Sequence, residues 1–306
     1  MKVYLLGRLL LAVPTLLGVA ALVFLLGHAL PSDPAEVMLG ERAAPAELAT
    51  LRHEMGLDRP LAVQFAGYLT DLSRGDLGRS LRTRRPVARE LTAAFPLTAR
   101  LGLTALLLAL ALALPAGAAA ARWPGGGLDR AALFFSTAGL SLPSFFLGPL
   151  LLLAFAVARP WFPISGPDEP GAVVLPALTL AVPLAAYLSR VVRASLREES
   201  ARDYLRAARA RGLSENRAFF RHAFQNALPP VATVAGLQLG AVLTGAVIAE
   251  KVFRWPGMGT LVLTAIGSRD YPVVQGVLLV FAVVTVAANL ASDLAVAALD
   301  PRVGRA

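Results

Sequence analysis

Residues 98–121 read TARLGLTALLLALALALPAGAAAA, and only Arg100, near the start of the stretch, carries a charge. A helix needs about 20 apolar residues to cross a hydrocarbon core of roughly 30 Å, so this stretch is long enough to span a membrane. Five other stretches meet the same criterion, and they cover residues 9–30, 131–158, 172–192, 228–249 and 272–294. We therefore expect an all-α integral membrane protein with six transmembrane helices. Prolines inside several stretches predict kinked helices, because neighbouring helices can satisfy the freed carbonyls.

The composition supports the same class. The chain has 306 residues, of which 56% are hydrophobic and 16% charged, and its mean hydropathy is +0.63, which excludes a soluble enzyme of ordinary composition. There are 29 Lys and Arg against 20 Asp and Glu. In a membrane protein this excess favours loops that face anionic lipid over a nucleic-acid interface, so we expect membrane lipid as a partner and no nucleic acid.

The distribution of arginine predicts the orientation. Residues 193–221, between the fourth and fifth apolar stretches, hold the densest arginine run, whereas the short loops on the other side hold only Arg159, Lys251, Arg254 and Arg269. The positive-inside rule then places both termini in the cytoplasm, and residues 31–97 are long enough to translocate despite their arginines. A cleaved signal peptide is the alternative for the first stretch, but its apolar run exceeds that of a signal peptide.

Residues 31–97 are expected to form a small helical extracytoplasmic insertion. Pro45 and Pro60 stand where first helical turns begin, and Gly56 and Gly75 stand where helices end. Helical spacing is kept by Leu61, Phe65, Tyr68 and Leu72. The alternative, a flexible linker, lacks such a period. The expected organisation is a first transmembrane helix over 1–30, this region over 31–97, and a five-helix core over 98–306.

Several kinds of chemistry have no residues to support them. Neither lysine, Lys2 or Lys251, follows a glycine, so the chain has no Walker A motif and we expect ATP and Mg²⁺ on separate subunits. The chain has no cysteine, and its 3 histidines are scattered, so no metal site or cofactor is expected. It has no G-x-S-x-G, H-E-x-x-H or EF-hand pattern, and its carboxylates lie outside or at the ends of the apolar stretches, so no enzymatic activity is expected. The middles of the apolar stretches hold no carboxylate for proton coupling, although sodium bound by backbone carbonyls remains open.

Residues 198–228 predict a cytoplasmic helix, a tight turn and a second helix. Acidic residues near the start match the helix dipole, Gly212 suits the position after a helix end, and Ser214 can cap the next helix. One face of the first helix carries Tyr204, Ala207, Ala208 and Arg211. The alanines leave a shallow surface for another protein, and the spacing of Phe220, Phe224 and Leu228 can anchor the second helix at the membrane. A solvated basic loop or an interfacial helix on anionic lipid is equally compatible with this composition.

Residues 206–213, RAARARGL, resemble the coupling motif of ABC-importer permeases, in which Gly follows Glu-Ala-Ala by three residues and Leu-Pro comes later, as Leu228–Pro229 does here. Arg206 replaces the motif's glutamate and the Gly-to-Pro spacing is longer, and both departures are typical of the dipeptide, oligopeptide and nickel branch. Further segments similar to that branch cover nearly the whole chain: 14–19 PTLLGV, 24–28 FLLGH, 33–35 DPA, 55–61 MGLDRPL, 75–80 GDLGRS, 85–87 RPV, 250–259 EKVFRWPGMG, 269–272 RDYP, 275–276 QG, Asn289 with Asp293, and 300–302 DPR.

The resemblance implies a type I importer permease of the DppB/OppB kind, with a MetI-like core, in the cell inner membrane. Its implied partners are a homologous second permease chain (DppC/OppC-like), two ATPase subunits or domains, and an extracytoplasmic solute-binding protein. The implied ATPase-coupling residues are Asp203, Tyr204, Arg206, Ala207, Ala208, Arg211, Gly212, Leu213, Ser214 and Asn216. An outer gate or binding-protein contact is expected at Glu250, Phe253, Trp255, Pro256 and Gly257.

The expected cargo is di- or oligopeptides, and nickel or glutathione import by the same architecture is the alternative. Two rival classes remain open at this stage. One is an ion-coupled secondary transporter, and the other is a membrane receptor or assembly subunit without a translocation path.

Overall fold

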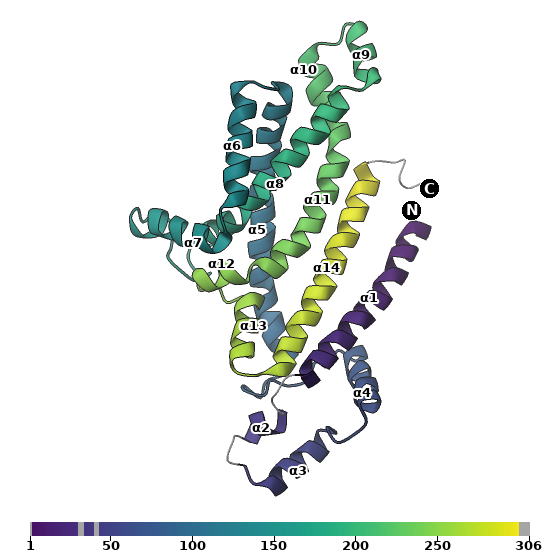
Figure 1. Ribbon diagram of the computed structural model, residues 1–306, viewed down its shortest axis with the longest axis vertical. Helices are drawn as coiled ribbons and strands as arrows, with labels where there is room; N and C mark the ends of the chain where they lie inside the picture. The colour runs from purple at the N-terminus through teal and green to yellow at the C-terminus, as the bar shows by residue number, and fades with distance from the viewer. Residues whose placement is uncertain (1, 30–33, 40–42, 300–306) are drawn as a thin grey trace. The chain divides into compact units, whose positions relative to one another are not determined.

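The computed structural model describes residues 2–29, 34–39 and 43–299 (Figure 1). The motif residues at 33 and 300–302 lie outside these ranges. Every regular element of the described residues is helical, apart from one isolated bridge between Arg79 and Pro86. The all-α class predicted from the apolar stretches is confirmed.

Five helical stretches of the described residues are long and apolar enough to cross a membrane. They coincide with all or most of the long helices α1 (Lys2–Ala29), α5 (Val87–Arg122), α8 (Val174–Ser200), α11 (Phe224–Gly245) and α14 (Tyr271–Leu299). Each coincides with an expected span. The fourth stretch runs without a long break from Glu215 to Val252, because shorter helical segments precede and follow α11.

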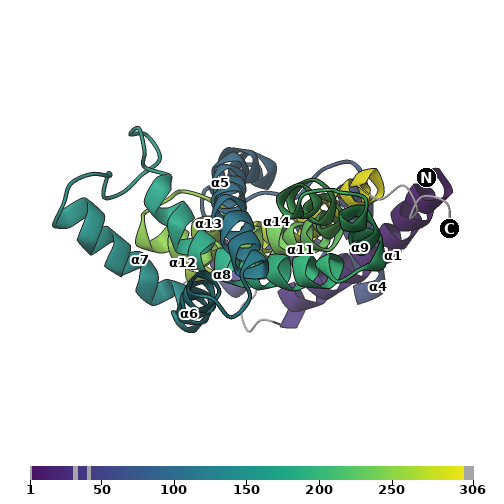
Figure 2. The ribbon, with the colours of Figure 1, turned by 90° about the horizontal axis from the view of Figure 1, so that it is seen from above.

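The remaining expected span, 131–158, is broken. Helices α6 (Gly127–Ser141) and α7 (Ser144–Leu152) are bent by 102° relative to one another, and Figures 1 and 2 show α7 leaving α6 in a different direction. The cause is local: Pro143 disfavours helical backbone at Leu142, which adopts φ −85° and ψ 114°. If this pair is counted as one span, the described residues have six.

The shorter elements connect these helices. They are α2 (Pro34–Leu39), α3 (Pro45–Glu54), α4 (Leu61–Ser73), α9 (Asp203–Ala210), α10 (Glu215–Arg217), α12 (Val247–Val252), α13 (Met258–Gly267) and two π-helical turns, η1 (Leu153–Val157) and η2 (Ala218–Ala223). Helix α3 begins at Pro45 and α4 directly follows Pro60, while Gly56 and Gly75 have φ of 67° and 75°. The helix boundaries predicted from proline and glycine are therefore confirmed.

By packing, the chain divides into two compact units. The larger unit consists mainly of residues 99–255 and 285–299, and the smaller consists of Leu6–Thr98 and Pro256–Val284. Small residues bring helices of the larger unit together: a Cβ on Gly117 of α5 would lie 2.7 Å from the Ser189 carbonyl of α8. In the smaller unit, Val87 and Leu91 pack with Val273 and Val277. The division into residues 1–30, 31–97 and 98–306 expected from the sequence remains a prediction. In this packing, residues 256–284 join the N-terminal part of the chain.

Candidate coupling site

Helix α9 and the short α10 form a hairpin of the larger unit, drawn where α8 ends and α11 begins in Figure 1. Gly212 ends α9 with φ +91°. Its amide donates to the Arg209 carbonyl at 2.9 Å, and the Leu213 amide donates to the Ala208 carbonyl at 3.2 Å. These two bonds form a Schellman motif, which requires a left-handed residue at the position of Gly212. The predicted helix, tight turn and helix is thus present. Ser214 occupies the N-cap position of α10, but its side chain makes no capping hydrogen bond.

One apolar side chain attaches α9 to the rest of the unit. Leu205 is the only buried residue of α9 and packs in a cluster with Leu196 of α8 and Phe219 of η2. Ala207 is exposed and Ala208 half-buried. The alanine face predicted from the sequence is therefore accessible, and Leu205 connects α9 to α8 and η2.

Polar contacts around Tyr204 brace the same hairpin. The Tyr204 hydroxyl donates to Glu199 Oε1 at 2.7 Å and accepts from Asn226 Nδ2 at 2.9 Å. Burial raises the pKa of Tyr204, so the phenol stays a neutral donor. The other carboxylate oxygen of Glu199 pairs with Arg202 Nε at 2.9 Å. The sequence predicted Tyr204 on the docking face and gave no signal for Glu199 or Asn226. In the structure, the Tyr204 hydroxyl forms hydrogen bonds with these two residues.

A second brace connects α10 to the end of α5. Arg122 lies 3.2 Å from Glu215 and donates to Asn216 Oδ1 at 3.2 Å. Its guanidinium carbon is 5.9 Å from the centroid of the Phe219 ring, a cation–π distance. The side chain of Asn216, expected at the ATPase interface, thus contributes to positioning α10.

Leu213, another predicted coupling residue, is half-buried and packs against the cluster around Leu205, whereas the charged ones lie on the outer surface. Asp203 and Arg206 form an exposed pair at 3.4 Å, which contributes little stability. Arg211 is also exposed. The hairpin therefore presents a small, arginine-rich surface around Ala207, while its opposite side is fixed by Leu205 and Tyr204.

The segment expected to form an outer gate is divided between the units. Glu250, Phe253 and Trp255 belong to the larger unit and are buried, Trp255 completely. The Trp255 amide donates to the Glu250 carbonyl at 2.7 Å, and the guanidinium carbon of Arg100 is 5.8 Å from the Trp255 ring centroid. These side chains offer no surface for a binding-protein contact in this conformation. Their part in a gate stays a prediction.

In the smaller unit, Pro256 is exposed and Gly257 is buried. The amide of the next residue, Met258, donates to Thr98 Oγ1 at 2.8 Å. This bond attaches the start of α13 to α5. Of the five residues expected at the gate, Pro256 alone is on the surface.

An exposed, braced hairpin between two apolar spans is the arrangement that the resemblance to importer permeases predicts. Residues 113–305 match the family described as the binding-protein-dependent transport system inner membrane component, and residues 1–102 match the N-terminal family of the same components. The chain belongs to this family, the permease subunits of ABC importers. The resemblance read from the motifs is confirmed, and the family implies ATPase and binding-protein partners and a place in the inner membrane.

Individual relatives agree with this assignment. The chain is 41% identical over 300 residues to the glutathione transport system permease protein GsiC of Salmonella choleraesuis (strain SC-B67), covering 98% of both chains. The GsiC protein of Escherichia coli (strain K12) is 40% identical over the same length and coverage. Among solved structures, an inward-facing MetNI methionine ABC transporter chain superimposes with a TM-score of 0.57 at 20% identity, covering 69% of this chain and 96% of that one. The last similarity concerns the fold alone.

Proposed function

We propose that this chain is one of two homologous permease subunits of an importer for short peptides, with glutathione as the first cargo to test. The proposal is carried by the 41% identity to a glutathione permease over 98% of both chains. Glutathione is itself a tripeptide, so it falls within the peptide class that the sequence motifs indicate. Two ATPase subunits or domains would bind ATP and Mg²⁺, and a solute-binding protein would deliver cargo to the extracytoplasmic side. Both termini would be cytoplasmic and residues 31–97 extracytoplasmic.

In this assembly, residues 203–216 would dock into a cleft of the ATPase. The accessible alanine face of α9 and the exposed arginines support docking against a surface that carries carboxylates. Closure of the ATPases would displace α9, and Leu205 and Tyr204 would transmit the displacement to α8 and α11. Alternating access then requires a bundle with two states and partners that bias them, and no catalysis by this chain.

Bulky substitutions test the docking site. Ala208→Trp and Ala207→Trp should insert normally but lose copurification of the ATPases and substrate-stimulated hydrolysis, because the large ring obstructs the cleft. Ala201→Trp, at an exposed position before α9, is the matched control and should behave like the wild type. If Ala208→Trp retains ATPase copurification and uptake, residues 203–216 are not the coupling site.

Reconstitution tests the cargo and the energy source. Proteoliposomes that contain the complete complex, with its binding protein, should accumulate glutathione or tri-alanine only when ATP is present on the side of the membrane where the ATPases lie. Transport by the purified chain alone would instead select an ion-coupled carrier. Uptake that persists in cells after deletion of this chain would select a receptor or assembly role.

A further inference from the structure

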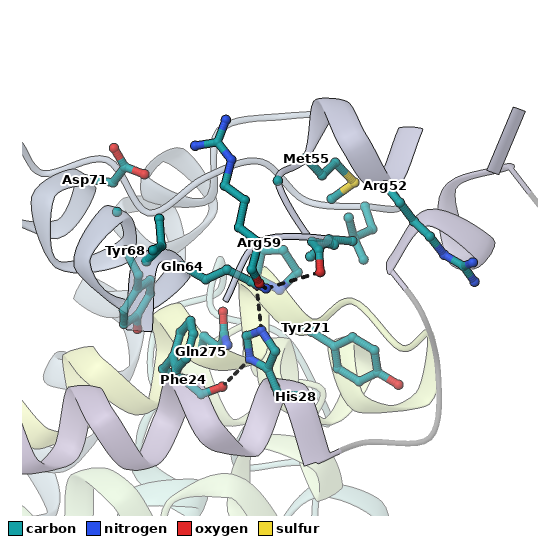
Figure 3. Close-up of a pocket in the computed structure, with 17 residues that line it drawn as sticks. Phe24, His28, Arg52, Met55, Arg59, Gln64, Tyr68, Asp71, Tyr271 and Gln275 are labelled. Carbon is teal, nitrogen blue, oxygen red and sulfur yellow. Dashed lines mark hydrogen bonds between the residues drawn. The ribbon is translucent and has the colours of Figure 1, made fainter. Parts of the chain in front are cut away.

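The smaller unit contains a cavity of about 710 Å³ that the coupling mechanism does not use. Its walls come from the end of α1, the α3–α4 connection, α4 and the start of α14 (Figure 3). This volume lies within the range of small-molecule sites in proteins. Aromatic side chains of Phe24, Tyr68 and Tyr271 contribute to the lining.

Hydrogen bonds fix one side of this cavity. His28 Nε2 lies 2.9 Å from Gln64 Oε1, and Gln64 Nε2 donates to the Arg59 carbonyl at 2.8 Å. Gln275 Nε2 donates to the Val23 carbonyl at 3.2 Å. Its amide oxygen points toward the cavity in Figure 3 and accepts no hydrogen bond within the described residues. The α3–α4 connection is thereby held in place over α1 before any ligand binds.

Two side chains of opposite charge, Arg59 and Asp71, line the cavity. Arg59 and Asp71 are both exposed, and within the described part of the chain neither forms an ion pair. Arg52, a further cation of the lining, differs because it is paired with Glu36 at 3.3 Å. In Figure 3 the Arg59 guanidinium and the Asp71 carboxylate occupy the same edge of the cavity, away from Phe24 and His28.

We propose that this cavity is a cargo site of the permease for a zwitterionic short peptide. Arg59 binds the peptide carboxylate, Asp71 binds its ammonium group, and the Gln275 oxygen accepts a peptide N–H. The aromatic lining receives an apolar side chain. A cation and an anion left for a ligand suit a zwitterion better than a purely anionic or cationic molecule. The inference rests on the proposed function for the cargo class and for the extracytoplasmic position of residues 31–97.

Direct binding to the complex without its binding protein tests this site. The probes are radiolabelled tri-alanine, its N-acetyl derivative and its C-terminal amide, added to the permease and ATPase complex in nanodiscs. Tri-alanine should bind, and either derivative should bind roughly tenfold more weakly, because each loses one charge-assisted contact. Arg59→Gln should weaken tri-alanine binding by a similar factor and abolish the discrimination against the amide. Asp71→Asn should abolish the discrimination against the N-acetyl peptide.

Two control variants remove a charge of the same sign outside the cavity. Arg74→Gln and Glu54→Gln change exposed residues near the ends of α4 and α3 that do not line it, and both should bind tri-alanine like the wild type. Monodisperse elution and wild-type basal ATP hydrolysis establish that each variant is assembled.

Several results would overturn the site. One is a wild-type complex that imports tri-alanine or glutathione with its binding protein but does not bind the imported peptide when the binding protein is absent. Another is unchanged discrimination in both Arg59→Gln and Asp71→Asn. A third is that Arg59→Gln and Asp71→Asn weaken the affinity of the complex for the binding protein but leave peptide binding unchanged, which would make the cavity a protein-docking site. In contrast, a complex that imports no peptide at all contradicts the proposed function itself.

Discussion

Asn226 of α11 donates a hydrogen bond to the hydroxyl of Tyr204 in α9 at 2.9 Å, across 22 residues of sequence. The same hydroxyl donates to Glu199, the penultimate residue of α8, at 2.7 Å. One side chain therefore joins the exposed hairpin to the two spans that flank it. Because these are directional contacts, they resist rotation of α9 in a way that the apolar contact of Leu205 alone does not.

Tyr204→Phe should loosen this connection while preserving the ring. Loss of the two hydrogen bonds leaves Glu199 and Asn226 without this partner and should cost about 1–2 kcal/mol of local stability. We expect normal insertion and ATPase copurification but reduced substrate-stimulated ATP hydrolysis. Tyr187→Phe is the matched control, because Tyr187 of α8 is 40% exposed and its hydroxyl makes no hydrogen bond within the described residues. Equal stimulation in both variants would contradict the bracing role.

Gly212→Val should distort the hairpin through the backbone alone. A Cβ at Gly212 would meet no heavy atom within 4 Å, but φ is +91°, where a β-branched residue is strained. The expected cost is about 1 kcal/mol or more, with loss of ATPase association. Gly245 also has open space where a Cβ would lie, but its φ is not positive. Gly245→Val should therefore retain association, measured by copurification from the same membranes.

The features predictable from sequence are those set by local patterns. Apolar length predicted the spans, and the proline and glycine positions predicted the ends of α3 and α4. Gly212 was predicted to take a positive φ for the same reason, because the residue after a helix end has few conformational choices. These signals depend on neighbours in the chain and require no knowledge of tertiary contacts.

Other features depend on contacts that the sequence does not reveal. The π-helical turn at Ala218–Ala223 interrupts the i, i+4 pattern, so Phe219 packs in the core whereas Phe220 is 55% exposed. The partners of Tyr204 come from two other helices. The segment around residues 250–257 was expected to form an outer gate or a binding-protein contact, yet Glu250 and Trp255 are fully buried.

The ion pair between Asp129 and Arg193 is another tertiary feature, and it should stabilise the larger unit. Arg193 donates to both carboxylate oxygens at 2.6 and 2.9 Å, and the Gly125 amide donates to Asp129 Oδ2 at 2.8 Å. Asp129 is only 3% exposed. Asp129→Ala leaves a half-buried guanidinium without this partner, so we expect a loss of about 1–3 kcal/mol.

Thermal unfolding in detergent measures this loss. The double variant Asp129→Ala/Arg193→Met should be more stable than Asp129→Ala, because it removes the unpaired charge together with its partner. Glu198→Ala, which removes an exposed partner of Arg202, should change the midpoint little. Equal losses in the single and double variants would show that the pair itself is not the cause.

Tyr68 of α4 presents the opposite case to Tyr204, because its buried hydroxyl has no hydrogen-bond partner among the residues that the structure describes. Its ring centroid lies 5.5 Å from that of Phe24, a contact that phenylalanine can preserve. Tyr68→Phe should therefore leave stability unchanged or raise it by about 1 kcal/mol, since it removes the cost of an unsatisfied buried group. A destabilisation equal to that of Tyr204→Phe would mean that the Tyr68 hydroxyl has a hydrogen-bond partner in the folded protein.

The same residue makes an alkaline pH dependence testable. Burial raises the pKa of Tyr68 to about 12, compared with about 10 in an unfolded chain. Between these values the unfolded chain has lost the phenolic proton and the folded one has kept it, so stability falls as pH rises through this window. Tyr68→Phe has no such proton and should lose less stability than the wild type between about pH 10 and 12. Chemical unfolding at several pH values in this window measures the difference, and parallel losses in the two proteins would contradict a buried, protonated Tyr68.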